Sequence, residues 1–178
     1  MGFLENILNE LNIDKNLDFL RRSTNFKIWD STLKQLSYEP YLYSNSSIKY
    51  QEEYRKLSII EYTDLSSIIN FKGKSIGVLP LAICKLNNEY IIFSQSYFNV
   101  QNDLPPLNNP IFIPLSEKIK NKVLYEIFKI IKKLTEILRI KEWKTTINFD
   151  GSHDLSSWHL LTMKLGAKAT IMHELCVD

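Results

Sequence analysis

The clearest hydrophobic pattern in the chain lies between residues 116 and 140. Apolar residues recur there every three or four positions, which predicts one buried stripe on a long amphipathic helix. The members of this stripe are Ile119, Val123, Leu124, Ile127, Phe128, Ile131, Leu134, Ile137 and Leu138. Pro114 precedes the pattern, and Ser116 is a favourable N-cap because its hydroxyl can accept a hydrogen bond from an amide of the first turn. We therefore expect a helix from Glu117 to about Ile140.

Shorter elements follow this long helix. Residues 144–149 are rich in β-branched and aromatic side chains that alternate with polar ones, which predicts a strand. Residues 155–165 predict a second helix. Its cap would be Ser152 or Asp154, and Gly166 would end it because glycine readily adopts the left-handed conformation.

Residues 65–93 carry the strongest strand signal. Two apolar runs are joined by a tight turn at residues 72–74, and a third run follows residues 87–88, so we expect three antiparallel strands in a meander. Pro80 lies inside the second strand, where it lacks an amide for the ladder and predicts a bulge or a sheet edge. Residues 111–113 add a short strand before the long helix.

Helical patterns precede the meander. Residues 1–11 are amphipathic and residues 14–36 weakly so, and we expect residues 1–40 to pack as an N-terminal helical segment on the domain. Residues 48–57 predict a short polar helix. No apolar run reaches the ~20 residues that cross a bilayer, and the N-terminus lacks the basic start of a signal peptide. A soluble, cytoplasmic protein is therefore expected.

The order of these elements predicts the fold class. Helices, a meander, a strand, a long helix, a strand, a shorter helix and a strand give an α+β domain, with a mixed and mainly antiparallel sheet flanked by helices. The 178 residues are 44% hydrophobic, which suits one globular domain spanning residues 1–178. Cys84 and Cys176 lie within apolar strand patterns, so both are expected to be buried thiols.

Two stretches resemble known transferases. The order of the elements, together with the late helix and glycine stop at residues 158–167, resembles the GNAT (Gcn5-related N-acyltransferase) fold. The hairpin at residues 71–81 further resembles FemAB-type transferases, which are built from two GNAT-like units with the active site between them. The resemblance covers residues 43–178. It implies an acyl- or aminoacyltransferase that acts on an amine or hydroxyl acceptor, such as an amino sugar or a cell-surface precursor.

The same resemblance implies partners and substrates. The chain has length for one GNAT-like unit, so a second unit would be supplied in cis or by a homodimer. Residues 170–177 alternate as a strand up to the end of the chain. Three interpretations follow: the N-terminal half of a longer two-unit protein, a homodimer that rebuilds the pair, or a degenerate unit. The expected substrate is a small molecule or glycan precursor, and the expected donor is acyl-CoA or aminoacyl-tRNA.

The junction before the long helix departs from the acetyl-CoA pattern. GNAT enzymes that use acetyl-CoA carry a Gln/Arg-x-x-Gly-x-Gly/Ala turn there, whose backbone amides hold the pyrophosphate. Residues 113–120 contain no glycine, Pro114 removes one donor, and Glu117 places a negative charge where phosphates would lie. We expect no acetyl-CoA site of this kind and no permanently bound cofactor.

Candidate chemistry lies in two polar segments. Residues 150–154 (Asp-Gly-Ser-His-Asp) follow a predicted strand, and a histidine beside carboxylates can serve as a general acid or base in acyl transfer. We assign His153 and Asp150 as candidate catalytic residues and Ser152 to substrate binding; an ordinary turn with a helix cap is the alternative. The loop from residue 95 to residue 110 supplies further candidate substrate-binding residues: Gln95, Tyr97, Asn99 and Asp103.

The spacing of the histidines and the distribution of charge bear on metal binding and on nucleic-acid binding. The three histidines have no metal-ligand spacing, so we expect no metal, and His159 is interpreted as a packing or hydrogen-bonding residue. Residues 115–145 hold nine basic and four acidic residues, a net +5, which leaves a net −3 elsewhere. Nucleic-acid binding through this lysine-rich helix is one interpretation, but scarce arginine favours a solvated face and leaves only tRNA as an expected nucleic acid. A non-catalytic GNAT-like unit that binds a partner domain or a substrate is the other alternative.

Overall fold

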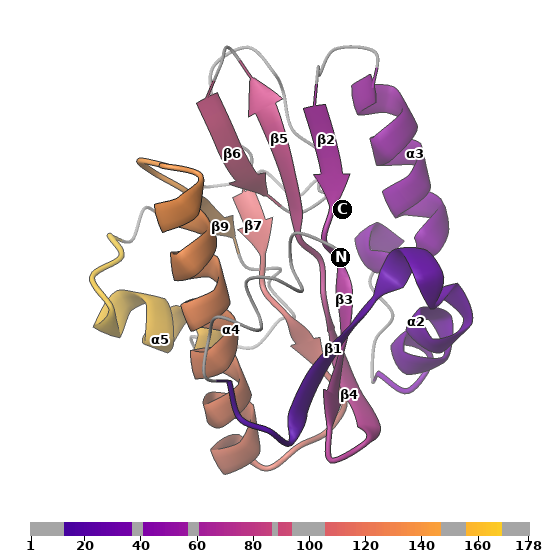
Figure 1. Ribbon diagram of the computed structural model, residues 1–178. Helices are drawn as coiled ribbons and strands as arrows, with labels where there is room; N and C mark the ends of the chain where they lie inside the picture. The colour runs from indigo at the N-terminus through magenta and orange to yellow at the C-terminus, as the bar shows by residue number, and fades with distance from the viewer. Residues whose placement is uncertain are drawn as a thin grey trace, which may run out of the picture.

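The computed structural model describes residues 13–36, 41–56, 61–86, 89–93, 106–146 and 156–168 (Figure 1). The elements are β1 (Leu17–Arg21), η1 (Arg22–Thr24), α2 (Phe26–Leu33), η2 (Tyr41–Tyr43), α3 (Asn45–Lys56), β2 (Glu61–Asp64), β3 (Ser67–Phe71), β4 (Lys74–Leu79), β5 (Ala82–Leu86), β6 (Glu89–Phe93), β7 (Pro106–Asn108), β8 (Ile111–Phe112), α4 (Glu117–Ile137), β9 (Lys144–Thr146) and α5 (Ser157–Lys164). Along the described residues, a run of seven strands, β2 to β8, separates the N-terminal helices from α4.

The strands form three small sheets between two groups of helices. β1, β3, β4 and β8 make one antiparallel sheet, and β2, β5 and β6 make a second. β7 and β9 make a third sheet, and they are parallel. In Figure 1, α4 and α5 lie on one side of the strands and α2 and α3 on the other. The α+β class with antiparallel sheets and flanking helices is thus confirmed.

The two larger sheets are halves of one long hairpin. Glu61 pairs with Lys85, Asp64 with Ala82 and Ser67 with Leu79, so the residue numbers of each pair add up to 146 on both sides of the break between the sheets. No residue is inserted at the break. The hairpin therefore bends there without changing register, and each half pairs with different outer strands.

Pro80 lies where the hairpin breaks, and a serine side chain there bonds the backbone of the next residue, Leu81. The Ser66 hydroxyl accepts a hydrogen bond from the amide of Leu81 (3.2 Å) and donates to its carbonyl (3.3 Å). The amide of Leu65 also donates to that carbonyl, at 2.8 Å. The second predicted strand is consequently divided into β4 and β5, rather than continuing through Pro80 as a single strand.

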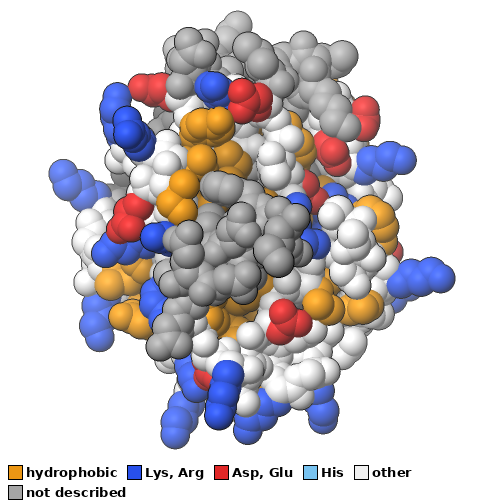
Figure 2. All heavy atoms as spheres, viewed as in Figure 1, with side chains coloured by type: hydrophobic (Ala, Val, Ile, Leu, Met, Phe, Trp, Pro, Cys, Tyr) orange, Lys and Arg blue, Asp and Glu red, His pale blue; other side chains and the backbone are white. Residues whose placement is uncertain are grey.

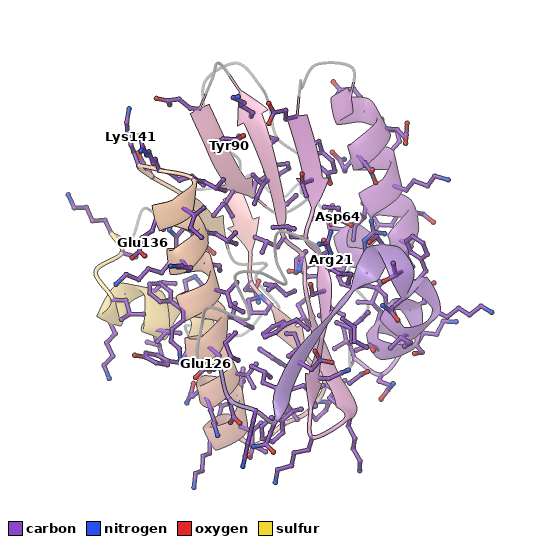
Figure 3. The ribbon with its side chains drawn as sticks, viewed as in Figure 1. Arg21, Asp64, Tyr90, Glu126, Glu136 and Lys141 are labelled. Carbon is purple, nitrogen blue, oxygen red and sulfur yellow. The ribbon has the colours of Figure 1, made fainter. Side chains whose placement is uncertain are left out.

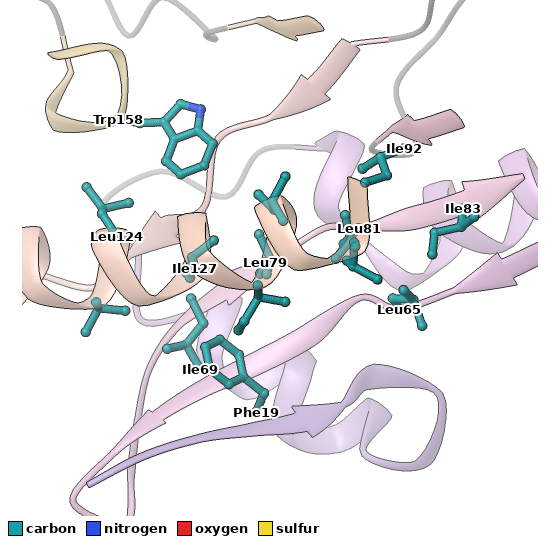
Figure 4. Packing of buried hydrophobic residues seen from close by; sticks show 14 of the residues in the cluster. Phe19, Leu65, Ile69, Leu79, Leu81, Ile83, Ile92, Leu124, Ile127 and Trp158 are labelled. Carbon is teal, nitrogen blue, oxygen red and sulfur yellow. The ribbon is translucent and has the colours of Figure 1, made fainter. Parts of the chain in front are cut away.

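Side chains on alternate positions fill two separate cores. Ile69 and Leu79 face α4, where they pack with Ile127 (Figure 4). Ile68 and Val78 face the other way, toward α2 and α3. The ladder pairs Ile69 with Gly77 and Asn70 with Ser75, which leaves Ile76 as the extra residue of a bulge and keeps it in the α4 core. Both sheet faces are therefore covered by helix.

The N-terminal prediction was partly wrong. Residues 14–36 were expected to be helical, yet residues 17–21 form the edge strand β1, which pairs with β3. Only residues 26–33 form an α-helix in this stretch. Five residues with apolar side chains at Leu17, Phe19 and Leu20 fit a helix or a strand equally well, and pairing with a distant strand decides between them.

Most other predicted elements are present. α4, β9 and α5 fall within the predicted ranges, α3 begins three residues before the predicted 48–57, and the tight turn at residues 72–74 joins β3 to β4. Gly166 has a φ of +98°, and the amide of Ala167 donates to the carbonyl of Thr162, which gives the expected glycine stop after α5. β2 was not predicted. The helix at residues 1–11 and the strand at residues 170–177 lie outside the described residues.

A buried ion pair joins the start of the chain to the bend of the hairpin. Arg22 is 3% exposed, and its Nε and Nη2 atoms donate to one carboxylate oxygen of Asp64, at 3.1 and 2.7 Å. Its Nη1 atom donates to the side chain of Asn45 in α3 at 2.8 Å. The second oxygen of Asp64 accepts from the amide of Ser66. Figure 3 shows Asp64 at this junction, beside Arg21, which donates to the carbonyl of Asp64.

We predict that Arg22→Ala lowers the free energy of unfolding by about 3–5 kcal/mol, because the carboxylate of Asp64 would stay buried without its partner. Urea denaturation measures this change. Lys85→Ala is the matched control, since it removes an ion pair with Glu61 that is exposed (3.3 Å) and whose loss should cost below about 1 kcal/mol. Equal losses in the two variants would contradict a structural role for the buried pair.

Candidate functional site

The residues predicted to perform chemistry lie outside the described residues. These are His153, Asp150, Ser152, Gln95, Tyr97, Asn99 and Asp103. The strands from which their segments extend are described, however. The loop candidates precede β7 and the His153 cluster follows β9, and these two strands are neighbours, with Pro106 opposite Lys144 and Asn108 opposite Thr146. The assignments of these residues remain predictions.

The N-terminus of α4 is occupied by a carboxylate of the chain itself. Glu117 accepts a hydrogen bond from the hydroxyl of Ser157 in α5 (3.0 Å) and pairs with Lys120 (3.4 Å). The hydrogen bond from Ser157, followed by the charge of Lys120, lowers the pKa of Glu117. An anionic ligand would therefore meet an ionised side chain where the helix dipole would otherwise attract it.

Ser116 differs from the prediction. It occupies the N-cap position of α4 with extended backbone angles, but its hydroxyl makes no capping hydrogen bond. Its carbonyl accepts from the amides of Ile119 and Lys120 in the usual helical manner. The acid in the first turn, rather than the serine, is thus the polar group that favours this helix start.

Aromatic side chains fix α5 against α4 and β9. Trp158 is buried, and its indole nitrogen donates to the hydroxyl of Thr145 at 2.8 Å. Its ring lies 6.5 Å from that of Trp143, which lies 6.5 Å from the ring of Phe128 on α4. These contacts, with the bond between Glu117 and Ser157, hold the helix that follows the predicted catalytic cluster.

Ser156 and His159 form a polar pair at the start of α5. The hydroxyl of Ser156 caps the helix by accepting from the amide of His159 (3.4 Å), so neither Ser152 nor Asp154 is the cap. The same oxygen lies 3.0 Å from Nδ1 of the His159 ring. Burial lowers the pKa of His159, which keeps the imidazole neutral near pH 7. A serine three residues before a histidine, at the start of an apolar run, is the sequence signal that identifies this pair.

A shallow depression of about 330 Å³ lies at the other end of α4. It is lined by Glu89, Tyr90, Ile137, Leu138, Arg139 and Lys141. Lys141 pairs with Glu89 at 3.1 Å, and both side chains are exposed, so this pair adds little binding energy. Figure 3 shows Tyr90 and Lys141 on this side of the molecule.

One residue that lines the depression has an unusual backbone conformation. Arg139 has a left-handed φ of 55°, where glycine is the usual residue.

Three of the six lysines of α4 are paired with neighbouring acids. Lys122 pairs with Asp14, and Lys129 with Glu126 at 2.7 Å, in addition to the contact between Lys120 and Glu117. On the face shown in Figure 2, basic side chains are spread around the rim, with acidic ones between them. On this face the basic side chains do not form one continuous surface of the kind that nucleic-acid binding needs.

Comparison with known protein families, with curated proteins and with solved structures gives no match to this chain. Within the described ranges, no group of three or more His, Cys, Asp or Glu side chains is placed to hold a metal ion. None of the helices in those ranges is long and apolar enough to cross a membrane. The geometry of the described elements is therefore the basis for assigning a function.

We predict that Arg139→Gly raises the free energy of unfolding by roughly 0.5–1 kcal/mol, because it relieves the left-handed backbone of a residue with a Cβ atom. Thermal and urea denaturation measure this change. Arg139→Ala is the control, since it removes the guanidinium but keeps the strain. A stability gain in the alanine variant equal to that in the glycine variant would contradict the backbone explanation.

We predict a pH-dependent loosening of α5 that requires Glu117. Because the pKa of Glu117 is lowered, its stabilising contribution is present above the ordinary value of 4.5 and is lost as the pH falls through the lowered value. Hydrogen exchange of the α5 amides should therefore accelerate below pH 4.5. Glu117→Gln should abolish this step, whereas Glu136→Gln, at the far end of α4, should retain it. Persistence of the step in Glu117→Gln would contradict the assignment. Asp14, whose pKa is about 2, also titrates in acid, and Glu117→Gln leaves its titration in place.

Proposed function

We propose that this chain is a GNAT-like unit of the FemAB type that serves acyl or aminoacyl transfer to an amine or hydroxyl acceptor, such as an amino sugar or a cell-surface precursor. The observation that carries the proposal is the connection from β7 to β9. Two parallel strands are joined by the 21-residue helix α4 and stand beside an antiparallel hairpin, and α5 with its glycine stop follows. The resemblance itself rests on the strand at residues 111–113, the long helix, the next strand and the late helix, and the parallel pairing of β7 with β9 adds to that order.

The contacts at the N-terminus of α4 are unfavourable for acetyl-CoA bound through a pyrophosphate turn, and they favour a different donor. Pro114 precedes the helix, and Glu117 is held at its first turn by Ser157 and Lys120. A pyrophosphate would have to displace these contacts and overcome the charge of the carboxylate. We propose aminoacyl-tRNA, or an acyl-CoA bound elsewhere, as the donor, with a second GNAT-like unit completing the site.

The proposed chemistry assigns one role to each predicted residue. His153 takes the proton from the acceptor amine or hydroxyl as that group attacks the acyl carbonyl, and Asp150 orients the imidazole. The bond from the acyl carbon to the donor oxygen or sulfur breaks, and the leaving group receives the proton. Contacts to the substrate come from Gln95, Tyr97, Asn99, Asp103 and Ser152.

A non-catalytic unit that binds a partner domain is the second candidate function, and the surface of α5 favours it. Leu160, Met163 and Leu165 are 55%, 44% and 43% exposed, although each is apolar. Exposed apolar side chains grouped on one short helix are typical of protein contacts. The same surface is compatible with catalysis, because a second unit must also dock in a two-unit enzyme.

We predict that His153→Ala lowers the transfer rate by about 10²-fold or more, because a general acid or base typically accelerates a reaction by at least that factor. The assay follows labelled acyl groups from acyl-CoA or charged tRNA to an amino sugar, with the chain in its native assembly. Asp150→Asn should lower the rate by a smaller factor. The control is His173→Ala, which changes a histidine of the predicted strand at residues 170–177, and its transfer rate should stay close to that of the unmodified protein.

Two outcomes would argue against this assignment. If the unmodified protein transfers from none of the donors, catalysis by this unit is wrong and partner binding is favoured. If His153→Ala retains the full rate, the transfer chemistry lies elsewhere in the chain.

A further inference from the structure

Ser156 and His159 have the geometry of a nucleophile and its base. The hydroxyl oxygen of Ser156 lies 3.0 Å from Nδ1 of His159, within the range that activates a serine. Both side chains are half-buried, so solvent-borne reagents reach them. We infer that Ser156 is an acyl-accepting nucleophile, that His159 is its general base, and that the substrate class is activated carboxylic esters and thioesters.

The proton arrangement required for this reaction is compatible with the contacts. When His159 is neutral and carries its proton on Nε2, Nδ1 accepts from the Ser156 hydroxyl. Burial, which lowers the pKa of the imidazole, favours this neutral form. The amide of His159 also donates to the Ser156 oxygen at 3.4 Å and stabilises negative charge that develops there.

The reaction balances without a cofactor. The Ser156 oxygen attacks the carbonyl carbon of the ester or thioester, and its proton passes to Nδ1 of His159. The bond from that carbon to the leaving oxygen or sulfur breaks, and the leaving group takes the proton from His159. The products are an O-acyl serine and a free alcohol or thiol.

Helix capping is the structural role that must be separated from this activity. A cap needs only an acceptor at position 156, which an aspartate supplies as well as a serine. A nucleophile needs the hydroxyl itself and the neutral imidazole beside it. Ser156→Asp therefore preserves the helix start and removes the proposed chemistry.

The inference is independent of the proposed transfer function. It uses Ser156 and His159 and not His153 or Asp150, and its substrate is an ester or thioester alone. If His153→Ala loses transfer but Ser156 is still acylated, the transfer function and the serine chemistry are separate. If transfer is retained but Ser156 is not acylated, only the inference about Ser156 is wrong.

The test is covalent labelling with p-nitrophenyl acetate, followed by mass spectrometry of the intact chain and of its peptides. We expect one acetyl group on Ser156, and none there in Ser156→Asp, whose circular dichroism and melting temperature should match the unmodified protein. Ser157 should stay unlabelled in the unmodified protein. This neighbouring serine is the matched control because it is hydrogen-bonded to Glu117 instead of to a histidine. His159→Gln should slow acylation at least about tenfold.

The pH profile separates a base from a purely structural histidine. The rate of Ser156 acylation should rise with pH as His159 loses its proton and level off below pH 6.5, the ordinary value for histidine, because the pKa of His159 is lowered. His159→Gln should lack this plateau. Acetylation confined to lysines, equal labelling of Ser157, or an unchanged rate in His159→Gln would each overturn the inference.

Discussion

The buried pair of Arg22 and Asp64 is the interaction on which the arrangement of the layers depends. Removing two charges from water is costly, and it is tolerated here because every nitrogen of the guanidinium and both carboxylate oxygens have partners. These groups belong to η1, which follows β1, to the start of α3, to the end of β2 and to the residues between β2 and β3. One polar contact therefore fixes the edge strand, the helical layer behind it and the angle of the long hairpin.

The break in the hairpin affects where β7 and β9 lie, the two strands from which the predicted site segments extend. Since the hairpin keeps its register through Ser66 and Pro80, β4 and β5 lie in one continuous strand path but pair with different neighbours. The β5 half leads through β6 toward β7, with which β6 is in contact. That half thus sets the position of the parallel pair β7 and β9, from which both predicted site segments extend. The ion pair at Arg22 and the site segments are linked through one hairpin.

The sequence predicts those elements whose pattern is long or whose signal is local. The stripe of α4 repeats over six turns, and Gly166 must adopt a conformation that glycine favours, so both were predicted. β1 was not, because five residues do not distinguish a period of two from one of 3.6, and its pairing with β3 spans about fifty residues of chain. The sequence pattern predicts that α5 begins at Leu155, whereas it begins at Ser157. Because that prediction makes Ser156 a helical residue rather than the N-cap, it gives no indication of the contact between Ser156 and His159. The residue types of the His153 cluster could be recognised, but the positions of their side chains depend on tertiary packing.

The contacts of α4 indicate where chemistry is to be sought. Its apolar stripe packs against the sheets, three of its lysines are paired with acids, and its N-terminus is occupied by Glu117. A helix with these contacts acts as a scaffold and offers neither a phosphate site nor a continuous basic surface. The strand β9 that follows it leads directly into the stretch from Asp150 to His159, which holds the residues of both proposals. Because Trp158 and Ser157 fix the start of α5 to Thr145 and Glu117, the side chains of Ser156 and His159 are positioned by contacts with the core.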